Sequence, residues 1–296
     1  MATSSRSRAG GAIAPATRMG TVRLMVSDLG RSRAFYEETL GLPATELENG
    51  DLAFGVGSGR PLVELRGDGS APPLDRRATG LFHLAVLLPS RLDLAHALAR
   101  LAETRWPLDG ASDHLVSEAL YLSDPDGNGI EIYRDRPREQ WRRVEGQLQM
   151  ATLPLDLRSV ADELGAGTGR QVQAPAGTTI GHVHLQVSEL EQIESFYAGL
   201  LGFDVMVRGY PGALFVSAGD YHHHLGLNTW QSAGSSAPVP GAVGLRSYEV
   251  QLPGAAELER LIARVSDAGL APRPDEEHGG WMLRDPSGNA VLLRAG

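Results

Sequence analysis

The chain repeats itself, and corresponding residues of its two halves lie at a constant offset. The repeated pieces are Thr21–Leu29 with His182–Leu190, Phe35-Tyr36 with Phe196-Tyr197, Leu40-Gly41-Leu42 with Leu201-Gly202-Phe203, and Asp124-Pro125-Asp126-Gly127-Asn128 with Asp285-Pro286-Ser287-Gly288-Asn289. Each piece is 161 residues from its counterpart (21 and 182, 35 and 196, 124 and 285). Self-similarity at one fixed offset indicates a duplicated unit, so we predict that the chain folds as two related domains.

Composition and charge restrict what the two domains can do. With 296 residues and 42% hydrophobic side chains, the chain can bury two cores of ordinary size. The net charge of −9 and the lack of a Lys/Arg cluster argue against nucleic-acid binding, which depends on a basic surface. No apolar run has the length of a membrane span, so no membrane partner is expected. Because there is no cysteine, any metal site must use His, Asp or Glu.

The domain boundaries follow changes in composition. Residues 1–17 are rich in Ser, Arg, Ala and Gly and lack the apolar stretch of a secretory signal. We therefore predict a disordered tail on a cytoplasmic protein, with a transit peptide as the alternative on composition alone. The first domain is expected over residues 18–137 and the second over residues 178–296. Residues 138–177 between them are rich in Pro, Gly and charge, which predicts a linker with a short helix at Leu157–Leu164.

Within each half, a strand, a helix and three strands follow one another twice. Thr21–Val26 alternates apolar and polar residues, as a half-buried strand does, and Leu29–Leu40 has helical spacing. The further elements predicted in the first half are a helix at Leu92–Leu101 and strands at Ala44–Leu47, Leu52–Val56, Pro61–Leu65, Phe82–Leu88, Trp106–Leu108, Ala119–Ser123 and Ile130–Tyr133. Residues 124–128 predict a tight turn between the last two strands. The second half repeats the cycle at residues 182–227 and 245–294, which gives four βαβββ modules.

Four such modules in two pairs resemble the vicinal oxygen chelate superfamily, which includes glyoxalase I, extradiol dioxygenases and fosfomycin-resistance thiol transferases. The resemblance extends from Gly20 to Leu293. The stretches Ala111–Pro125 and Tyr221–Trp230 are similar to the two-domain bacterial catechol 2,3-dioxygenase-type branch. The resemblance implies an α+β fold and an oxidoreductase that cleaves a catechol-like aromatic diol with dioxygen, in the catabolism of aromatic compounds. Since this scaffold hosts several chemistries, the site residues must decide between them.

The resemblance also implies where a metal would bind. Ligands in the superfamily come from the first strands of two partner modules and the last strand of one, which correspond here to Thr21, His83, His182, Ser247, Glu131 and Leu292. If module 2 pairs with module 3, and module 1 with module 4, one site holds His83, Glu131 and His182 and the other holds no ligand. If each domain closed on itself, neither site would have three ligands. We therefore predict swapped pairing and one two-His-one-carboxylate site, which suits iron(II), with manganese(II) as the alternative.

A run of three histidines supplies a candidate base. The run His222-His223-His224 is predicted to lie on the last strand of module 3, where alternation sets His223 on the face opposite to the other two. The match of His222-His223-His224-Leu225 to the related dioxygenases selects His223. The residues alone leave open which of the three histidines faces the metal cavity.

Two further residues match pocket positions of the dioxygenases. Tyr121, ten residues before Glu131, matches a hydroxyl that donates to the substrate oxygen, and His114 matches a second pocket histidine after a shift of two residues. In module 4, Tyr248 and Trp281 are predicted to fill the vacated second site. We expect that second site to be packed or water-filled and inert.

Two other functions stay open at this point. A glyoxalase-like isomerase or thiol transferase would need another carboxylate from His222–Leu225, which contains none, although His224 could replace it. A non-enzymatic drug-binding protein would use the cavity without a metal. The expected partners are a small aromatic diol and dioxygen, and the chain is expected to be a monomer, as a pseudo-dimer of its halves, or a homo-oligomer.

Overall fold

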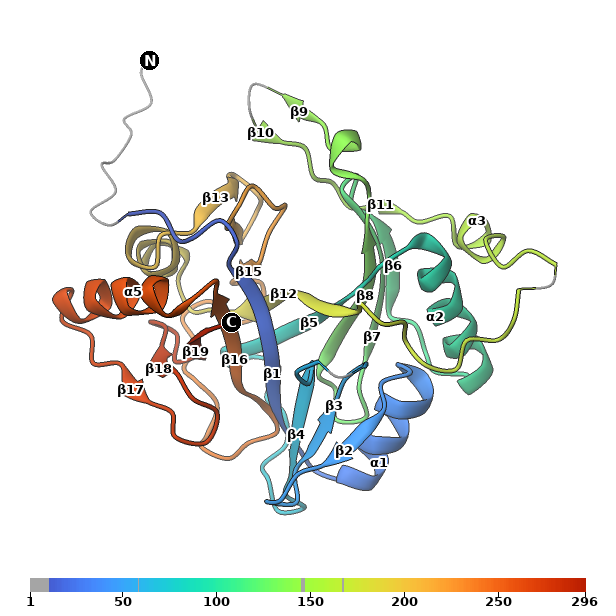
Figure 1. Cartoon of the computed structure of the whole chain (residues 1–296), viewed down its shortest axis with the longest axis horizontal. Helices are drawn as coiled ribbons and strands as arrows, with labels where there is room; N and C mark the ends of the chain where they lie inside the picture. Colours follow the sequence, from blue (N-terminus) through green and yellow to red (C-terminus); the bar gives the residue numbers. More distant parts are fainter. Residues whose placement is uncertain (1–10, 58, 145–146, 167) are drawn as a thin grey trace.

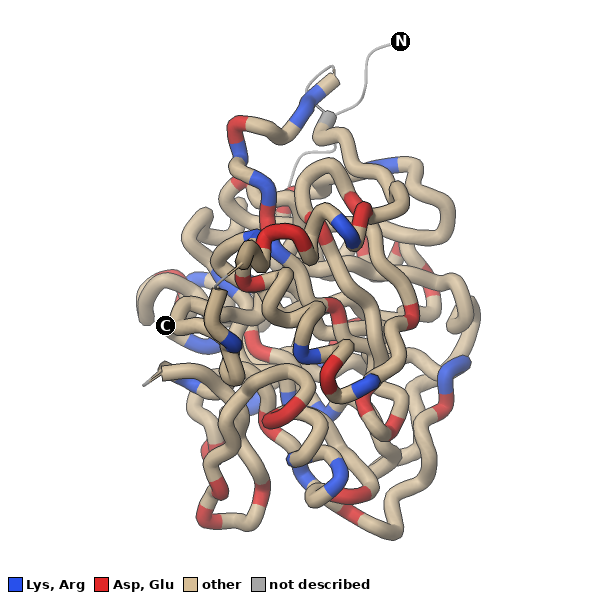
Figure 2. The backbone as a smooth tube through the Cα atoms, turned by 90° about the vertical axis from the view of Figure 1, so that its right-hand side faces the viewer, with Lys and Arg blue, Asp and Glu red and all other residues tan. Residues whose placement is uncertain are grey.

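The structure is a computed structural model that describes residues 11–57, 59–144, 147–166 and 168–296. In these ranges the chain forms two large mixed β-sheets, with the helices at the periphery (Figure 1). No helix in these ranges is both long enough and apolar enough to cross a membrane. Acidic and basic residues are interspersed along the chain (Figure 2).

Each module has the predicted order of one strand, one helix and three strands. Module 1 contains β1 Arg18–Val26, α1 Leu29–Ala34, β2 Ala44–Glu46, β3 Leu52–Phe54 and β4 Val63–Gly67. Module 2 contains β5 Gly80–Leu88, α2 Arg91–Thr104, β6 Gly110–Asp113, β7 Ser117–Ser123 and β8 Gly129–Asp135. Module 3 contains β12 Thr179–Gln186, α4 Leu190–Glu194, β13 Asp204–Val207, β14 Ala213–Ser217 and β15 Leu225–Asn228. Module 4 contains β16 Gly244–Leu252, α5 Ala255–Asp267, β17 Arg273–Pro274, β18 Trp281–Arg284 and β19 Ala290–Ala295.

The predicted helix of residues 29–40 changes its winding part of the way along. After α1 the chain continues as the π-helical segment η1 Phe35–Thr39, and module 3 does the same with η3 Ser195–Leu200. Gly41 follows with a φ of +73°, a conformation that suits glycine because it has no Cβ. The helix therefore ends where the sequence predicts.

The sheet order confirms the swapped pairing of modules. Module 2 and module 3 form a nine-stranded sheet of order β11-β6-β7-β8-β5-β12-β15-β14-β13, and module 1 and module 4 form an eight-stranded sheet of order β17-β18-β19-β16-β1-β4-β3-β2. In the first sheet β5 and β12 pair antiparallel, and in the second β1 and β16 do so. Each sheet therefore contains strands from both halves of the chain.

Alternation along the strands separates a helix-facing core from the opposite face. In β5, Leu84, Val86 and Leu88 are buried in the main hydrophobic core, while Ala85 belongs to a small separate cluster with Tyr133 of β8. Helix α2 covers the core face with an apolar stripe that includes Leu94 and Leu101. Ser90 begins α2 because its side chain accepts the Asp93 amide N–H. This arrangement leaves the other face of the strands free to build a site.

One strand predicted in the first half is wrong. Residues 106–108 are not in a strand, and β6 begins at Gly110 instead. The Trp106 ring packs 4.5 Å from Phe35, and its Nε1 donates to the Ser123 carbonyl at 2.9 Å. These side-chain contacts hold the segment without a backbone ladder.

The predicted linker contains part of the nine-stranded sheet. It begins with η2 Arg138–Gln140, β9 Arg143–Val144 and β10 Gln147–Leu148, and continues with β11 Leu153–Pro154 and α3 Leu157–Ala161. Because β11 pairs with β6, this segment joins the edge of the sheet. The short predicted helix is therefore present, one turn shorter than expected.

The described part of the predicted tail is packed rather than disordered. Ile13 is buried, and its amide N–H donates to the Gly202 carbonyl at 2.9 Å. Thr17 is buried as well. The prediction is therefore wrong for residues 11–17, and residues 1–10 lie outside the described ranges.

Candidate metal centre

Three neighbouring strands bring the predicted ligands together. Ala85 of β5 lies opposite Glu131 of β8 on one side and opposite His182 of β12 on the other. His83 is two residues before Ala85 and therefore projects from the same face of β5. The small side chain of Ala85 leaves room for the three larger ones to converge.

The ligand atoms converge on one carboxylate oxygen. His83 Nε2 and His182 Nε2 each lie 3.1 Å from Glu131 Oε2. One ligand atom from each residue can be chosen so that all three lie within 4.8 Å of one another. Ligands on metal bonds of about 2.1 Å in adjacent octahedral positions are about 3 Å apart, so this spacing suits a shared cation.

The buried polar atoms also fit a cation. Glu131 is 3% exposed and His182 is 1% exposed. Burial would raise the pKa of Glu131, but the contacts with the adjacent imidazoles of His182 and His83 lower that pKa well below its ordinary range. Burial lowers the pKa of His182 to about 4, which keeps its ring neutral and able to coordinate. Nε2 of His83 has no hydrogen-bond partner despite its distance to Glu131, as expected for an atom that ligates.

The histidine run lies before a strand rather than on one. Strand β15 begins at Leu225, so the predicted strand position of residues 222–224 is wrong. His223 lines the cavity, with its ring centroid 4.1 Å from that of His182. His224 instead lies within hydrogen-bond distance of Ser217, with Nδ1 2.9 Å from Oγ.

His222 connects His223 to a carboxylate. His222 Nε2 lies 2.9 Å from Asp135 Oδ1, and its Nδ1 lies 2.7 Å from Nδ1 of His223. Because a carboxylate only accepts, a neutral His222 donates through Nε2 and accepts through Nδ1. His223 then donates through Nδ1, which leaves its Nε2 as an acceptor. Burial lowers the pKa of His223 well below its ordinary value, in keeping with a neutral ring.

Tyr121 and His114 form a hydrogen-bonded pair on the cavity wall. His114 Nδ1 donates to the Ala151 carbonyl at 2.7 Å, so its Nε2 accepts the Tyr121 hydroxyl at 2.6 Å. Burial and the charge of Glu131 raise the pKa of Tyr121 well above its ordinary value. The phenol therefore keeps its proton near neutral pH.

These residues surround a cavity of about 340 Å³. Its lining includes two of the three predicted ligands, His83 and Glu131, both pocket residues above and the predicted base. It is completed by residues of modules 2 and 3 and of the segment between them: Phe82, Ser112, Ser117, Met150, Ala151, Thr152, His184, Val207, Tyr210, Phe215 and Trp230. His182 is not among the lining residues. The predicted linker thus contributes residues 150–152 to the site.

Sequence reasoning missed several residues of this site. His184 lines the cavity, and strand alternation from His182 puts it on the same face, so this signal was available. Asp135 gave no comparable signal, because its contact with His222 joins a strand end in module 2 to a loop in module 3.

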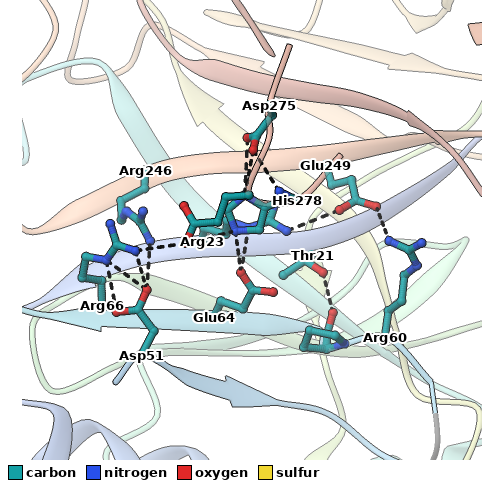
Figure 3. A network of polar contacts seen from close by, with 12 residues as sticks. Thr21, Arg23, Asp51, Arg60, Glu64, Arg66, Arg246, Glu249, Asp275 and His278 are labelled. Carbon is teal, nitrogen blue, oxygen red and sulfur yellow. Dashed lines mark hydrogen bonds and ion pairs between the residues drawn. The ribbon is translucent and has the colours of Figure 1, made fainter. Parts of the chain in front are cut away.

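In the eight-stranded sheet the positions that match the predicted ligands hold Thr21, Ser247 and Leu292, none of them charged, and charged side chains lie beside them (Figure 3). Arg23 of β1 lies opposite Ser247 as His184 lies opposite His83, so Thr21 corresponds to His182. Similarly, Leu292 lies opposite Glu249 as Glu131 lies opposite Ala85. Each sheet therefore has a carboxylate in this region, but on a different strand of the module. Glu131 lies on the last strand of module 2, whereas Glu249 lies on the first strand of module 4.

We call this set of side chains the charged network. Its members are Arg23, Asp51, Arg60, Glu64, Arg66, Arg246, Glu249, Asp275 and His278 (Figure 3). Arg23, 3% exposed, donates through Nε to Glu64 Oε2 at 2.7 Å, and its Nη2 lies 3.6 Å from Glu249 Oε2. His278 Nε2 lies 3.4 Å from Glu64 Oε2. The cations that neutralise these buried carboxylates therefore belong to the chain itself.

The prediction that Tyr248 and Trp281 fill this second site is wrong for Tyr248. Its hydroxyl lies 2.6 Å from that of Tyr197, a residue of η3, so the ring lies on the helix side of the sheet. Trp281 is partly buried on β18 and is not part of the charged network. Ion pairs of the charged network lie at the second site in place of the two rings.

Comparisons with known proteins agree with this architecture. The chain is 42% identical over 280 residues to a protein named catechol-2,3-dioxygenase from Bacillus subtilis (strain 168), which covers 93% of this chain and 96% of the relative. A solved structure from Bacillus subtilis subsp. subtilis str. 168 has a TM-score of 0.64 at 14% identity, over 97% of this chain and 86% of the other. The crystal structure of glyoxalase I from Zea mays has a TM-score of 0.57 at 16% identity, over 94% and 92%.

A family model matches the chain twice, at residues 18–132 and 179–293. The two matches correspond to the two halves of the repeat, and each begins at a first strand and ends within a last strand. The chain therefore belongs to the Glyoxalase/Bleomycin resistance protein/Dioxygenase superfamily.

Proposed function

We propose that the chain is an extradiol ring-cleaving dioxygenase that uses iron(II), with manganese(II) as the alternative, and acts on a catechol-like aromatic diol. The observation that carries this proposal is the convergence of His83, Glu131 and His182 beside a cavity. The relative named catechol-2,3-dioxygenase supports it, because the match covers nearly the whole of both chains.

His83, Glu131 and His182 would hold the metal. Two imidazoles and one carboxylate on one side of a divalent iron leave positions for both oxygens of a diol and for dioxygen, so the metal would supply the place where they meet. The three side chains come from both halves of one chain, and we propose that a monomer is sufficient for activity.

His223 is the proposed general base. Its Nε2 is left as an acceptor by the contacts of its Nδ1 with His222, and the ring lines the cavity next to His182. It can therefore take a proton from a substrate hydroxyl and return it later in the reaction. His222 and Asp135 hold the ring in this orientation.

Tyr121 is the proposed hydrogen-bond donor to the substrate oxygen. Its raised pKa keeps the proton on the phenol, and His114 fixes the position of the hydroxyl. A short rotation of the O–H bond would turn the hydrogen from His114 to a substrate in the cavity.

The overall reaction balances without a further reductant. Both atoms of dioxygen enter the product, and the ring carbon–carbon bond next to the two hydroxyl-bearing carbons breaks. The diol supplies the electrons that reduce dioxygen. We propose that this reaction serves aromatic catabolism in the cytoplasm.

Oxygen consumption tests the proposal directly. Protein loaded with iron(II) without air and then mixed with catechol in aerated buffer should consume one dioxygen per catechol and form a yellow ring-opened product. The absence of both oxygen uptake and colour with every simple catechol would contradict the proposal.

A parallel assay distinguishes the glyoxalase-like alternative. Consumption of the hemithioacetal of methylglyoxal and glutathione, without oxygen uptake on catechol, would favour an isomerase. The proposal instead predicts no consumption of the hemithioacetal. Among the described residues, the group that could hold a metal contains His83, Glu131 and His182 and no second carboxylate.

A further inference from the structure

Five aromatic side chains in the cavity wall each contact the next, and the last contacts the first. In this order they are Phe82, Trp230, Tyr210, Phe215 and His184. Successive ring centroids are 5.3, 6.5, 5.6, 5.8 and 5.0 Å apart. These separations are typical of aromatic side chains in contact. We call this set the aromatic wall.

The aromatic wall lies next to the candidate metal centre. The rings of Phe82 and His184 lie 5.4 and 4.9 Å from that of His83. On the other side, the Phe215 ring lies 5.1 Å from His223. The aromatic wall is therefore within reach of a substituent on a diol bound at the metal.

Two glycines make room for two of these rings. A Cβ on Gly226 would lie 2.8 Å from Cγ of His184, and a Cβ on Gly212 would lie 2.9 Å from Cδ1 of Trp230. Trp230 is 46% exposed, yet its Nε1 donates to the Pro211 carbonyl at 2.9 Å, which holds the ring at the cavity mouth. Contacts with neighbouring residues therefore fix the positions of these two rings.

The charge of the lining restricts the substituent. Among the described lining residues there is no Arg, Lys or Asp, and Glu131 is already committed to the metal group. A carboxylate here would lose water without gaining a cation, and an ammonium would have no carboxylate of its own. An uncharged apolar group has no such desolvation cost.

We propose that the substrate is a catechol with an uncharged, flat, apolar substituent such as a phenyl ring, which the aromatic wall binds. This inference rests on the proposed function, because the metal positions the diol. A flat ring fits between the aromatic side chains, buries apolar surface and gains ring–ring contacts.

A second hollow offers the competing arrangement. This hollow of about 230 Å³ shares Phe82, His83 and Tyr121 with the main cavity and is also lined by Arg76 and Asp109. An anionic substituent would be attracted to Arg76, and Asp109 would weaken that attraction. Preference for carboxylated catechols would therefore overturn the proposal.

Matched substrates test the inference. The value of kcat/KM should be at least tenfold higher for 3-phenylcatechol or 4-phenylcatechol than for catechol. It should also be at least tenfold higher for methyl 3,4-dihydroxybenzoate than for 3,4-dihydroxybenzoate, which differs in its charge. Equal values, or a preference for the acid or for dopamine, would overturn the inference.

A Trp230 variant tests whether the aromatic wall causes the substrate preference. In W230A, the ratio of kcat/KM for phenylcatechol to that for catechol should fall at least tenfold. The control W281A removes a tryptophan from the other sheet and should leave this ratio unchanged. An unchanged ratio in W230A would contradict the inference.

Binding to the metal-free protein separates this inference from the proposed function. The probe is 3-phenylphenol, which has one hydroxyl and cannot chelate a metal, and calorimetry measures its affinity. It should bind at least tenfold more tightly than phenol, and W230A should lose that advantage. If this holds while no catechol is cleaved, only the proposed function fails. If catechols are cleaved while 3-phenylphenol and phenol bind equally, only this inference fails.

Discussion

The two sheets share one module order and a matching strand register, but their buried carboxylates have different partners. The nine-stranded sheet presents the imidazoles of His83 and His182 and the carboxylate of Glu131, and burial lowers the pKa of His182 to about 4. The eight-stranded sheet presents buried carboxylates with Arg23 already between Glu64 and Glu249. The difference indicates that one site could bind a cation from outside, whereas the other carries its cation in the chain.

The largest expected effect is the loss of the metal when His182 is removed. H182A should retain less than about a tenth of the metal of the wild-type protein and lose at least about 1000-fold in kcat/KM on catechol. Elemental analysis and oxygen uptake measure the two quantities. The matched control is T21A at the corresponding position of the other sheet, which loses one hydrogen bond to Pro61 and should keep its metal. If H182A keeps both its metal and its activity, the proposed difference between the two sheets is wrong.

The second prediction concerns the internal cation. R23M removes the buried cation that lies 2.7 Å from Glu64 and 3.6 Å from Glu249, while Arg294 stays 3.6 Å from Glu249, so the free energy of unfolding should fall by about 3 kcal/mol. The exposed pair of Arg208 and Glu194 supplies the control, because R208M should change stability by less than about 1 kcal/mol. Urea denaturation measures both. A loss in R23M no greater than that in R208M would show that the charged network does not need its arginine.

The third prediction is that metal binding stabilises the protein by an amount that does not depend on the charged network. A metal at about 100 times its Kd raises the free energy of unfolding by about 2.7 kcal/mol. Loading with iron(II) under nitrogen should raise the unfolding free energy of wild type and R23M by the same amount, and a chelator should reverse it. A stabilising effect that persists in H182A, or disappears in R23M, would place the metal elsewhere.

The smallest expected effect is a pH dependence in the charged network. The hydrogen bond to Glu64 raises the pKa of His278 above its ordinary value of 6.5, against the opposing effect of burial. The groups around it are Glu64, Asp275, Glu277 and, as a neighbouring cation, Arg23. Because the folded pKa is raised, this stabilisation is complete below pH 6.5 and is lost as the pH rises through the folded pKa.

Comparison with H278Q isolates this contribution. The unfolding free energy of wild type minus that of H278Q should be largest at pH 5.5 and should decrease steadily towards pH 8.5. A difference that is constant or increases with pH would contradict the assignment.

The repeat and its turns carried most of the information about the fold. The turn at residues 124–128 forms as predicted, with the Gly127 amide donating to the Asp124 carbonyl and Gly127 at a φ of +88°. Such turns depend on local geometry, so the sequence reveals them directly. The swapped pairing was predicted from the sorting of ligand positions, because only this pairing concentrates His83, Glu131 and His182 in one place.

Contacts between distant segments were not predictable in the same way. The charged network joins five stretches of modules 1 and 4, and no local pattern relates Arg23 to Glu64 or Glu249. The aromatic wall has the same origin, since Phe82 and Trp230 meet only after modules 2 and 3 pair. The histidine run at 222–224 was placed on a strand because alternation was assumed to extend into a segment that is a loop.

The most direct test of the central claim is an anomalous-difference map from crystals of the full chain grown with iron(II) under nitrogen. The account predicts a single peak per chain, within about 2.5 Å of His83 Nε2, His182 Nε2 and a Glu131 carboxylate oxygen. A peak in the charged network, a second peak of equal height, or no peak at these three side chains would contradict it.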